Sequence, residues 1–173
     1  MLRRIVMVAV TISVTLLTLA GSSRAELKQV PVARIHAQLL VDAAPAAVWT
    51  TLTTGKNLVT WCPVWKNAAN VKVTIAKVGD VLDFTDQWGN GGRSVVTYLV
   101  RNKEIRVAHE PNDGSYMCQA KITLEPSGAG TTVHYTEQYT DESATKDFEA
   151  TAQKMQSDMD QTLASLKRSA EKK

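Results

Sequence analysis

Alternating hydrophobic and polar residues run along most of the chain from about residue 33 onward. The segment 33–42, ARIHAQLLVD, places every second side chain on one face and so predicts a first β-strand. Turn sequences, GNGG at 89–92 and PNDG at 111–114, separate neighbouring segments of this kind. The alternation predicts six further strands, at about 69–76, 80–88, 93–101, 104–110, 115–126 and 130–140.

Two stretches of the chain change to helical spacing. Pro45 begins the first helix, because its fixed φ and missing N–H cost little in a first turn, and Gly55 is predicted to end it. The residues KNLVTW then form a second short helix before Pro63. A long helix is predicted at about 143–170, since apolar residues recur there at steps of three or four: Phe148, Ala152, Met155, Met159, Leu163 and Leu166.

The first 25 residues have the pattern of a secretory signal peptide. Arg3 and Arg4 precede an apolar run at 5–20. Ser23-Arg24-Ala25 follows it and supplies the small residues that a signal peptidase reads, so cleavage is expected after Ala25.

An uncleaved membrane anchor is the alternative interpretation of this segment. Its apolar run is shorter than the roughly 20 residues that a spanning helix needs, and it is interrupted by hydroxyl side chains: Thr11, Ser13, Thr15 and Thr18. We therefore expect a signal peptide at 1–25 and one domain at 26–173. The domain is expected to be periplasmic or secreted, with no stable membrane insertion after cleavage.

Removal of the signal peptide changes the charge of the chain. Arg3, Arg4 and Arg24 leave with it, so 17 of the 20 basic residues remain against 17 acidic ones. A chain without net charge lacks the basic surface that binds nucleic acid or anionic lipid, so neither is an expected partner. The remaining length, 173 residues less 25, suits a single domain with one core.

The segment 41–65, VDAAPAAVWTTLTTGKNLVTWCPVW, resembles the opening of the START-like, helix-grip (SRPBCC) superfamily. Val48-Trp49 matches the apolar–tryptophan pair that follows a small-residue and proline turn in this superfamily, and Leu58 and Trp61 match its second helix. The superfamily includes the major birch pollen allergen, the polyketide cyclase/dehydrase and lipid-transport families, and the START lipid-transfer domains. The resemblance covers nearly all of the chain after the signal peptide.

The resemblance implies an α+β helix-grip fold. A curved seven-stranded antiparallel sheet would wrap around the long C-terminal helix, with two short helices after the first strand and a cavity between sheet and helix. The superfamily includes binders, transporters and enzymes, so the fold alone does not define the function.

The alternation within each strand predicts which side chains face this cavity. An apolar cavity with a few polar groups is typical of a small-molecule site. We therefore expect one small hydrophobic molecule, lipid or polyketide-like, and no cofactor. Its predicted binding residues are Trp61, Trp65, Phe84, Trp88, Tyr98, His109, Tyr116, Tyr135, Glu137, Met155 and Met159.

Two other interpretations stay open. The inner face carries the polar residues His109, Glu137 and Asp86, and a histidine beside a carboxylate in an apolar cavity can act as a general base. This chemistry would suit an enzyme of the polyketide cyclase/dehydrase type, although no nucleophile or phosphate-loop motif accompanies it, and a structural role for His109 is the simpler assignment. In the third interpretation the cavity is collapsed and the domain is a structural or partner-binding module.

The histidines and cysteines bear on metal sites and disulfides. His36, His109 and His134 are far apart, and the chain has no Cys-x-x-Cys or His-x-x-x-His spacing, so no metal is expected. Cys62 and Cys118 would meet an oxidising compartment, where a disulfide is one alternative and two buried free thiols are the other. Closing a loop of about 56 residues would add roughly 3–4 kcal/mol of stability.

Overall fold

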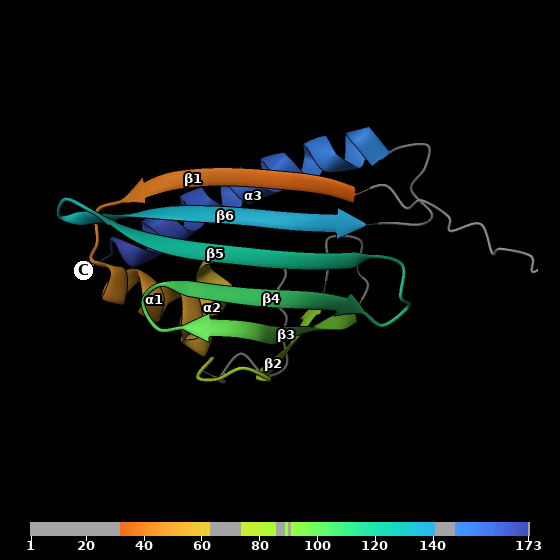
Figure 1. The fold of residues 1–173 in the computed structure, drawn as a ribbon, viewed down its shortest axis with the longest axis horizontal. Helices are drawn as coiled ribbons and strands as arrows, with labels where there is room; N and C mark the ends of the chain where they lie inside the picture. Colours follow the sequence, from red (N-terminus) through yellow and green to blue (C-terminus); the bar gives the residue numbers. More distant parts are fainter. Residues whose placement is uncertain (1–31, 63–73, 86–88, 90, 141–147, 173) are drawn as a thin grey trace, which may run out of the picture.

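The structure is a computed structural model that describes residues 32–62, 74–85, 89, 91–140 and 148–172. These residues form six strands and three helices (Figure 1). Their order is β1 (Val32–Val41), α1 (Pro45–Thr53), α2 (Gly55–Trp61), β2 (Val81–Thr85), β3 (Gly91–Val100), β4 (Glu104–Pro111), β5 (Met117–Ser127), β6 (Gly130–Thr140) and α3 (Phe148–Ala170).

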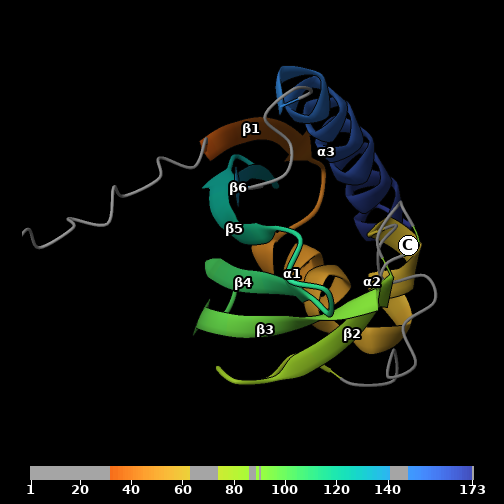
Figure 2. The same cartoon turned by 90° about the vertical axis from the view of Figure 1, so that its right-hand side faces the viewer.

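The six strands form one antiparallel sheet in the order β1-β6-β5-β4-β3-β2. Strands β2 to β6 follow one another as a meander, and β1 pairs with β6 at the far edge. The sheet is strongly curved, and all three helices lie on its concave side (Figure 2). This arrangement confirms the predicted α+β architecture of a curved sheet around a C-terminal helix.

Helix α3 also protects the edge of the sheet. The side chains of Gln156 and Lys167 donate hydrogen bonds to the β1 carbonyls of His36 (3.1 Å) and Leu40 (2.7 Å). Carbonyl groups along an edge strand would otherwise be open to pairing with another chain. One face of α3 packs into the core through three buried side chains, Met159, Leu163 and Leu166.

The prediction of seven strands is wrong, since the described residues contain six. Most of the segment 69–76 lies outside the described residues, and its end at 74–76 is not a strand. The N–H of Ile75 donates to the carbonyl of Thr53 (2.8 Å), and the Ile75 side chain is buried in the core. This end of the segment is therefore attached to the end of α1, and its polar backbone is paired outside the sheet.

The break between the two short helices is made by Thr54. Thr54 has an extended backbone (φ −86°, ψ 123°) and caps both the end of α1 and the start of α2. Gly55 is the buried first residue of α2, so its prediction as the end of α1 is wrong. Trp61 ends α2, and its indole N–H donates to the carbonyl of Thr51 (3.1 Å), which holds α2 against α1.

The alternation of inward-facing and outward-facing side chains is interrupted at one place in β3. The register between β3 and β4 shifts between Val96 and Tyr98, which reverses the faces of the residues beyond it. Tyr98 is therefore 41% exposed, and the Arg106 guanidinium lies 4.7 Å from its ring centroid. Leu99 packs against the core instead. The prediction that Tyr98 faces the cavity is wrong.

Several predictions fall on residues that the structure does not describe. They are the signal peptide at 1–25, the start of the C-terminal helix before Phe148, and the side chains of Trp65, Asp86 and Trp88. Among the helices of the described residues, none combines the length and hydrophobicity needed to cross a membrane.

Candidate functional site

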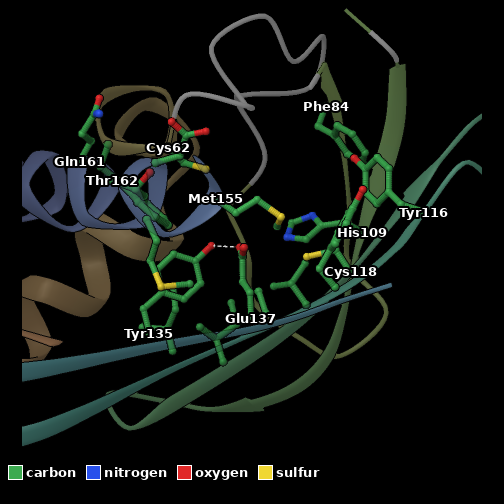
Figure 3. Close-up of a pocket in the computed structure, with 18 of the residues that line it drawn as sticks. Cys62, Phe84, His109, Tyr116, Cys118, Tyr135, Glu137, Met155, Gln161 and Thr162 are labelled. Atoms are coloured by element: carbon green, nitrogen blue, oxygen red, sulfur yellow. Dashed lines mark hydrogen bonds between the residues drawn. The ribbon is translucent and has the colours of Figure 1, made fainter. Parts of the chain in front are cut away.

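A cavity of about 350 Å³ lies between the concave face of the sheet and α3 (Figure 3). Cavities that bind small molecules typically measure about 300–1,000 Å³, so this one lies at the compact end of the range. Helix α2, strands β2, β4, β5 and β6, and the adjoining residues Cys62 and Tyr116 supply the rest of its wall. The lining is Trp61, Cys62, Phe84, Thr85, Ile105, Val107, His109, Tyr116, Cys118, Ala120, Ile122, Tyr135, Glu137, Tyr139, Met155, Asp158, Met159, Gln161 and Thr162.

Most of the predicted binding residues line this cavity. Tyr98 does not, and Trp65 and Trp88 lie outside the described residues. The predicted residues that do line it are Trp61, Phe84, His109, Tyr116, Tyr135, Glu137, Met155 and Met159. Whether they bind a ligand stays a prediction.

Helix α3 contributes polar side chains that the sequence analysis missed. Asp158, Gln161 and Thr162 line the cavity beside the apolar residues of the helix. Asp158 and Thr162 are three residues beyond Met155 and Met159, respectively, so they lie on the same side of the helix. The helical spacing that predicted the apolar face could therefore have identified them.

The strand register gathers three chemically reactive side chains. His109 on β4 is paired with Cys118 on β5, and Glu137 on β6 is paired with Ala120, two residues along β5 from Cys118. Because all of them face the concave side, one ligand atom each from His109, Cys118 and Glu137 lies within 4.8 Å of the others. The alternation predicted an inner-face position for His109 and Glu137, but no local pattern predicted that Cys118 would join them.

Two hydrogen bonds orient this cluster. The Nδ1 atom of His109 lies 2.8 Å from the hydroxyl oxygen of Ser94, a fully buried residue on β3. The hydroxyl of Tyr135 donates to the Oε1 atom of Glu137 (Figure 3). The ring of Phe84 meets the imidazole of His109 edge to face, with centroids 5.8 Å apart, and so restricts the ring further.

Burial keeps most of these groups uncharged at neutral pH. It lowers the pKa of His109 to about 4 and raises the pKa of Cys118, where the nearby Glu137 adds to the effect. Burial also raises the pKa of Tyr135, and the same cause raises the pKa of Glu137 against the opposing hydrogen bond from Tyr135. The cluster thus presents a neutral imidazole, thiol and phenol beside the carboxyl group of Glu137.

The remaining cysteine and histidine predictions concern the disulfide and the position of His36 and His134 relative to the cavity. Cys62 and Cys118 are both buried and are not joined by a disulfide in the structure. Both line the cavity, Cys62 at α2 and Cys118 beside His109 (Figure 3). His36 and His134 stack on each other with ring centroids 6.2 Å apart and do not line the cavity.

Solved structures with a similar fold come from several organisms. Protein BH1534 from Bacillus halodurans is 16% identical, with a TM-score of 0.65 over 80% of this chain and 97% of its own. Protein CV1439 from Chromobacterium violaceum is 17% identical, with a TM-score of 0.64 over 81% and 98%. A norcoclaurine synthase point mutant from Thalictrum, in complex with a transition-state analogue, is 14% identical, with a TM-score of 0.60 over 83% and 96%.

Identities this low show a shared fold and nothing more. No curated protein matches the chain. A family described as polyketide cyclase/dehydrase and lipid transport matches residues 32–171, which is most of the sequence. The chain therefore belongs to the polyketide cyclase/dehydrase and lipid transport family, within the START-like, helix-grip superfamily.

Proposed function

We propose that this protein is an exported binder of a small hydrophobic molecule, which it holds between the sheet and α3. The observation that carries the proposal is the cavity of about 350 Å³, which has a mainly apolar wall and a few grouped polar atoms. A protein that only needed a core would gain stability by filling this space, since unfilled volume costs packing contacts.

The lining indicates the chemistry of the ligand. Burial of apolar surface contributes about 25 cal/mol per Å², so a compact ligand that buries roughly 250 Å² gains about 6 kcal/mol before the costs of binding. The carboxyl groups of Glu137 and Asp158 disfavour an anionic head group. A neutral hydroxyl group could instead donate to the oxygen of Tyr135, whose own proton is donated to Glu137. The ligand class that fits is a compact, uncharged lipid or polyketide-like molecule.

Filling the cavity should weaken binding of the ligand. Ala120 lies in the floor of the cavity between Cys118 and Ile122 on β5 and is 7% exposed. Ala120→Phe places a ring in the ligand's space and is expected to weaken binding at least tenfold, about 1.4 kcal/mol. The measurement is native mass spectrometry of protein purified from the periplasm of its native host, followed by organic extraction. It quantifies the passenger, which is the ligand that copurifies with the protein.

The matched control uses the neighbouring residue. Gln119 is exposed on the other face of β5, so Gln119→Phe adds the same ring outside the cavity and should keep the passenger. If wild-type protein is empty and takes up no lipid or aromatic probe, the binding proposal is wrong. Equal passenger content in Ala120→Phe and wild-type protein would show that the ligand binds elsewhere.

An acid–base enzyme is the second candidate, because ligand atoms of His109 and Glu137 lie within 4.8 Å of one another in the same cavity. A pKa of about 4 makes His109 a weak base at neutral pH, whereas the raised pKa of Glu137 suits proton transfer. Norcoclaurine synthase shows that an enzyme can have this fold. Conversion of the extracted molecule by wild-type protein, but not by a Glu137→Gln variant that still binds it, would favour this candidate.

Export is a separate part of the proposal. It is supported by the arginines, apolar run and Ser23-Arg24-Ala25 sequence at the N-terminus. Expression of the full chain in a Gram-negative host should give a periplasmic protein. Its intact mass should correspond to a chain that begins at Glu26. A full-length mass in the membrane fraction would instead indicate an uncleaved anchor.

A further inference from the structure

We propose that His109, Cys118 and Glu137 bind one divalent transition-metal ion of the Zn²⁺ class, with a coordination position open to the cavity. The three residues come from three adjacent strands, β4, β5 and β6, and their ligand atoms lie within 4.8 Å of one another. This site goes beyond the binding of a hydrophobic molecule and does not depend on it.

The spacing of the cluster fits tetrahedral coordination. Zn²⁺ binds imidazole nitrogen and carboxylate oxygen at about 2.0–2.2 Å and thiolate sulfur at about 2.3 Å, which places the ligand atoms roughly 3.5 Å apart. The three side chains need to move inward by about 1 Å to reach that spacing. They stand on neighbouring positions of a hydrogen-bonded sheet, so the backbone that carries them is already in place.

The charge of the donor set selects a divalent ion. A thiolate from Cys118 and a carboxylate from Glu137 together carry two negative charges, and neutral His109 adds none. A divalent ion therefore gives a site with no net charge, the state that costs least in an apolar cavity. Cu⁺ would leave one negative charge uncompensated, and Mg²⁺ and Ca²⁺ prefer six or more oxygen ligands.

Hydrogen bonds outside the cluster hold two of the three ligands. The Nδ1 atom of His109 lies 2.8 Å from the Ser94 hydroxyl, and this contact holds the imidazole ring in the cluster. The hydroxyl of Tyr135 occupies Oε1 of Glu137 and leaves Oε2 for coordination. Partners of this kind fix the orientation of a ligand and are typical of protein metal sites.

The open position of the ion would face the ligand space. Met155 of α3 points toward His109 from the opposite side of the cavity (Figure 3). Between them a water, or a hydroxyl or carbonyl oxygen of the bound molecule, would complete the coordination. The ion would thus orient the polar end of the hydrophobic ligand and polarise a carbonyl there.

The test is a metal titration of untagged, reduced protein that has been freed of metal by a chelator and of any passenger by extraction. Zn²⁺ is expected to bind at one ion per chain. Co²⁺, which replaces Zn²⁺ as a coloured probe, is expected to give a thiolate-to-metal charge-transfer band. Cys118→Ser should lose that band and bind Zn²⁺ at least about 100-fold more weakly, since it removes a direct ligand.

Cys62→Ser is the matched control, because Cys62 is also a buried cysteine outside any disulfide that lines the cavity but is not one of the three ligands. It should keep both the band and the affinity. Should Cys118→Ser fail to fold, alkylation of wild-type protein gives the same information: Zn²⁺ should slow modification of Cys118 and leave Cys62 unchanged.

Any of three results would overturn the proposal. The protein could fail to bind Zn²⁺ at one ion per chain, or Co²⁺ could bind without a thiolate-to-metal band. The third result is an equal loss of Zn²⁺ affinity in Cys118→Ser and Cys62→Ser. Because the titration uses only metal ions, its failure would leave the hydrophobic binder proposal intact. Conversely, a protein that binds Zn²⁺ but no hydrophobic molecule would support the metal site and contradict the binder proposal.

Discussion

Gly92→Ala is expected to lower the free energy of unfolding by about 2–4 kcal/mol and to disturb the cavity. A Cβ atom on Gly92 would lie 2.6 Å from the carbonyl oxygen of Glu110 and 2.4 Å from Cζ of the Phe84 ring. The carbonyl belongs to the neighbouring strand β4, so it cannot move without loosening the β3–β4 pairing. The Phe84 ring would have to turn away from its edge-to-face contact with His109.

Gly91→Ala supplies the control for this prediction. Among the described residues, the new Cβ would meet the side-chain amide of Asn112 at 3.1 Å and the Phe84 carbonyl at 4.0 Å, and the amide can rotate away. Its cost should stay within about 1 kcal/mol. Urea unfolding measures both variants, and uptake of a hydrophobic probe reports on the cavity. Equal stability of the two variants would show that β3 and Phe84 adjust freely.

Much of the fold follows from local patterns in the sequence. The period-two alternation identifies each strand of the sheet because one face is buried on the helices, and the three-and-four spacing identifies α3 because one side of it is buried. The bulge after Val96 carries no such signal: Val95, Val96, Tyr98, Leu99 and Val100 are all compatible with either face. Packing across β3 and β4, which no local pattern encodes, determines that Tyr98 turns outward.

The site was predictable in its parts but not as a cluster. Alternation predicted that His109 and Glu137 lie on the inner face, and both line the cavity together with Cys118. Their proximity depends on the register in which neighbouring strands pair, and the hairpin turns determine that register. A hairpin centred between Asp113 and Gly114 puts residue 109 opposite residue 118, as observed. The residues 109, 118 and 137 match no linear metal motif because each comes from a different strand.

The stability of metal-free protein should fall by up to about 3 kcal/mol between pH 6.5 and pH 4 because of His109. Burial lowers the pKa of folded His109 from 6.5 to about 4. Between these values the unfolded chain binds a proton that the folded protein excludes, so acid favours unfolding. The contribution of His109 is therefore fully present above pH 6.5 and is lost as the pH falls to about 4.

Other ionisable groups facing His109 must be separated from this effect. Glu137 on β6 acts in the opposite direction, since its pKa is raised in the folded protein and protonation there favours folding. The cavity is also lined by Cys118 on β5, Asp158 on α3 and the tyrosines Tyr116, Tyr135 and Tyr139. The diagnostic quantity is thus the difference in pH dependence between wild-type protein and His109→Gln, with urea unfolding measured at each pH. His109→Gln should lose the His109 part of the slope, whereas His36→Gln, at an exposed position on β1, should keep it.

Identical slopes for wild type and His109→Gln would mean that the cavity admits enough water to solvate a charged imidazole. The apolar character on which the binding proposal rests would then be lost as well.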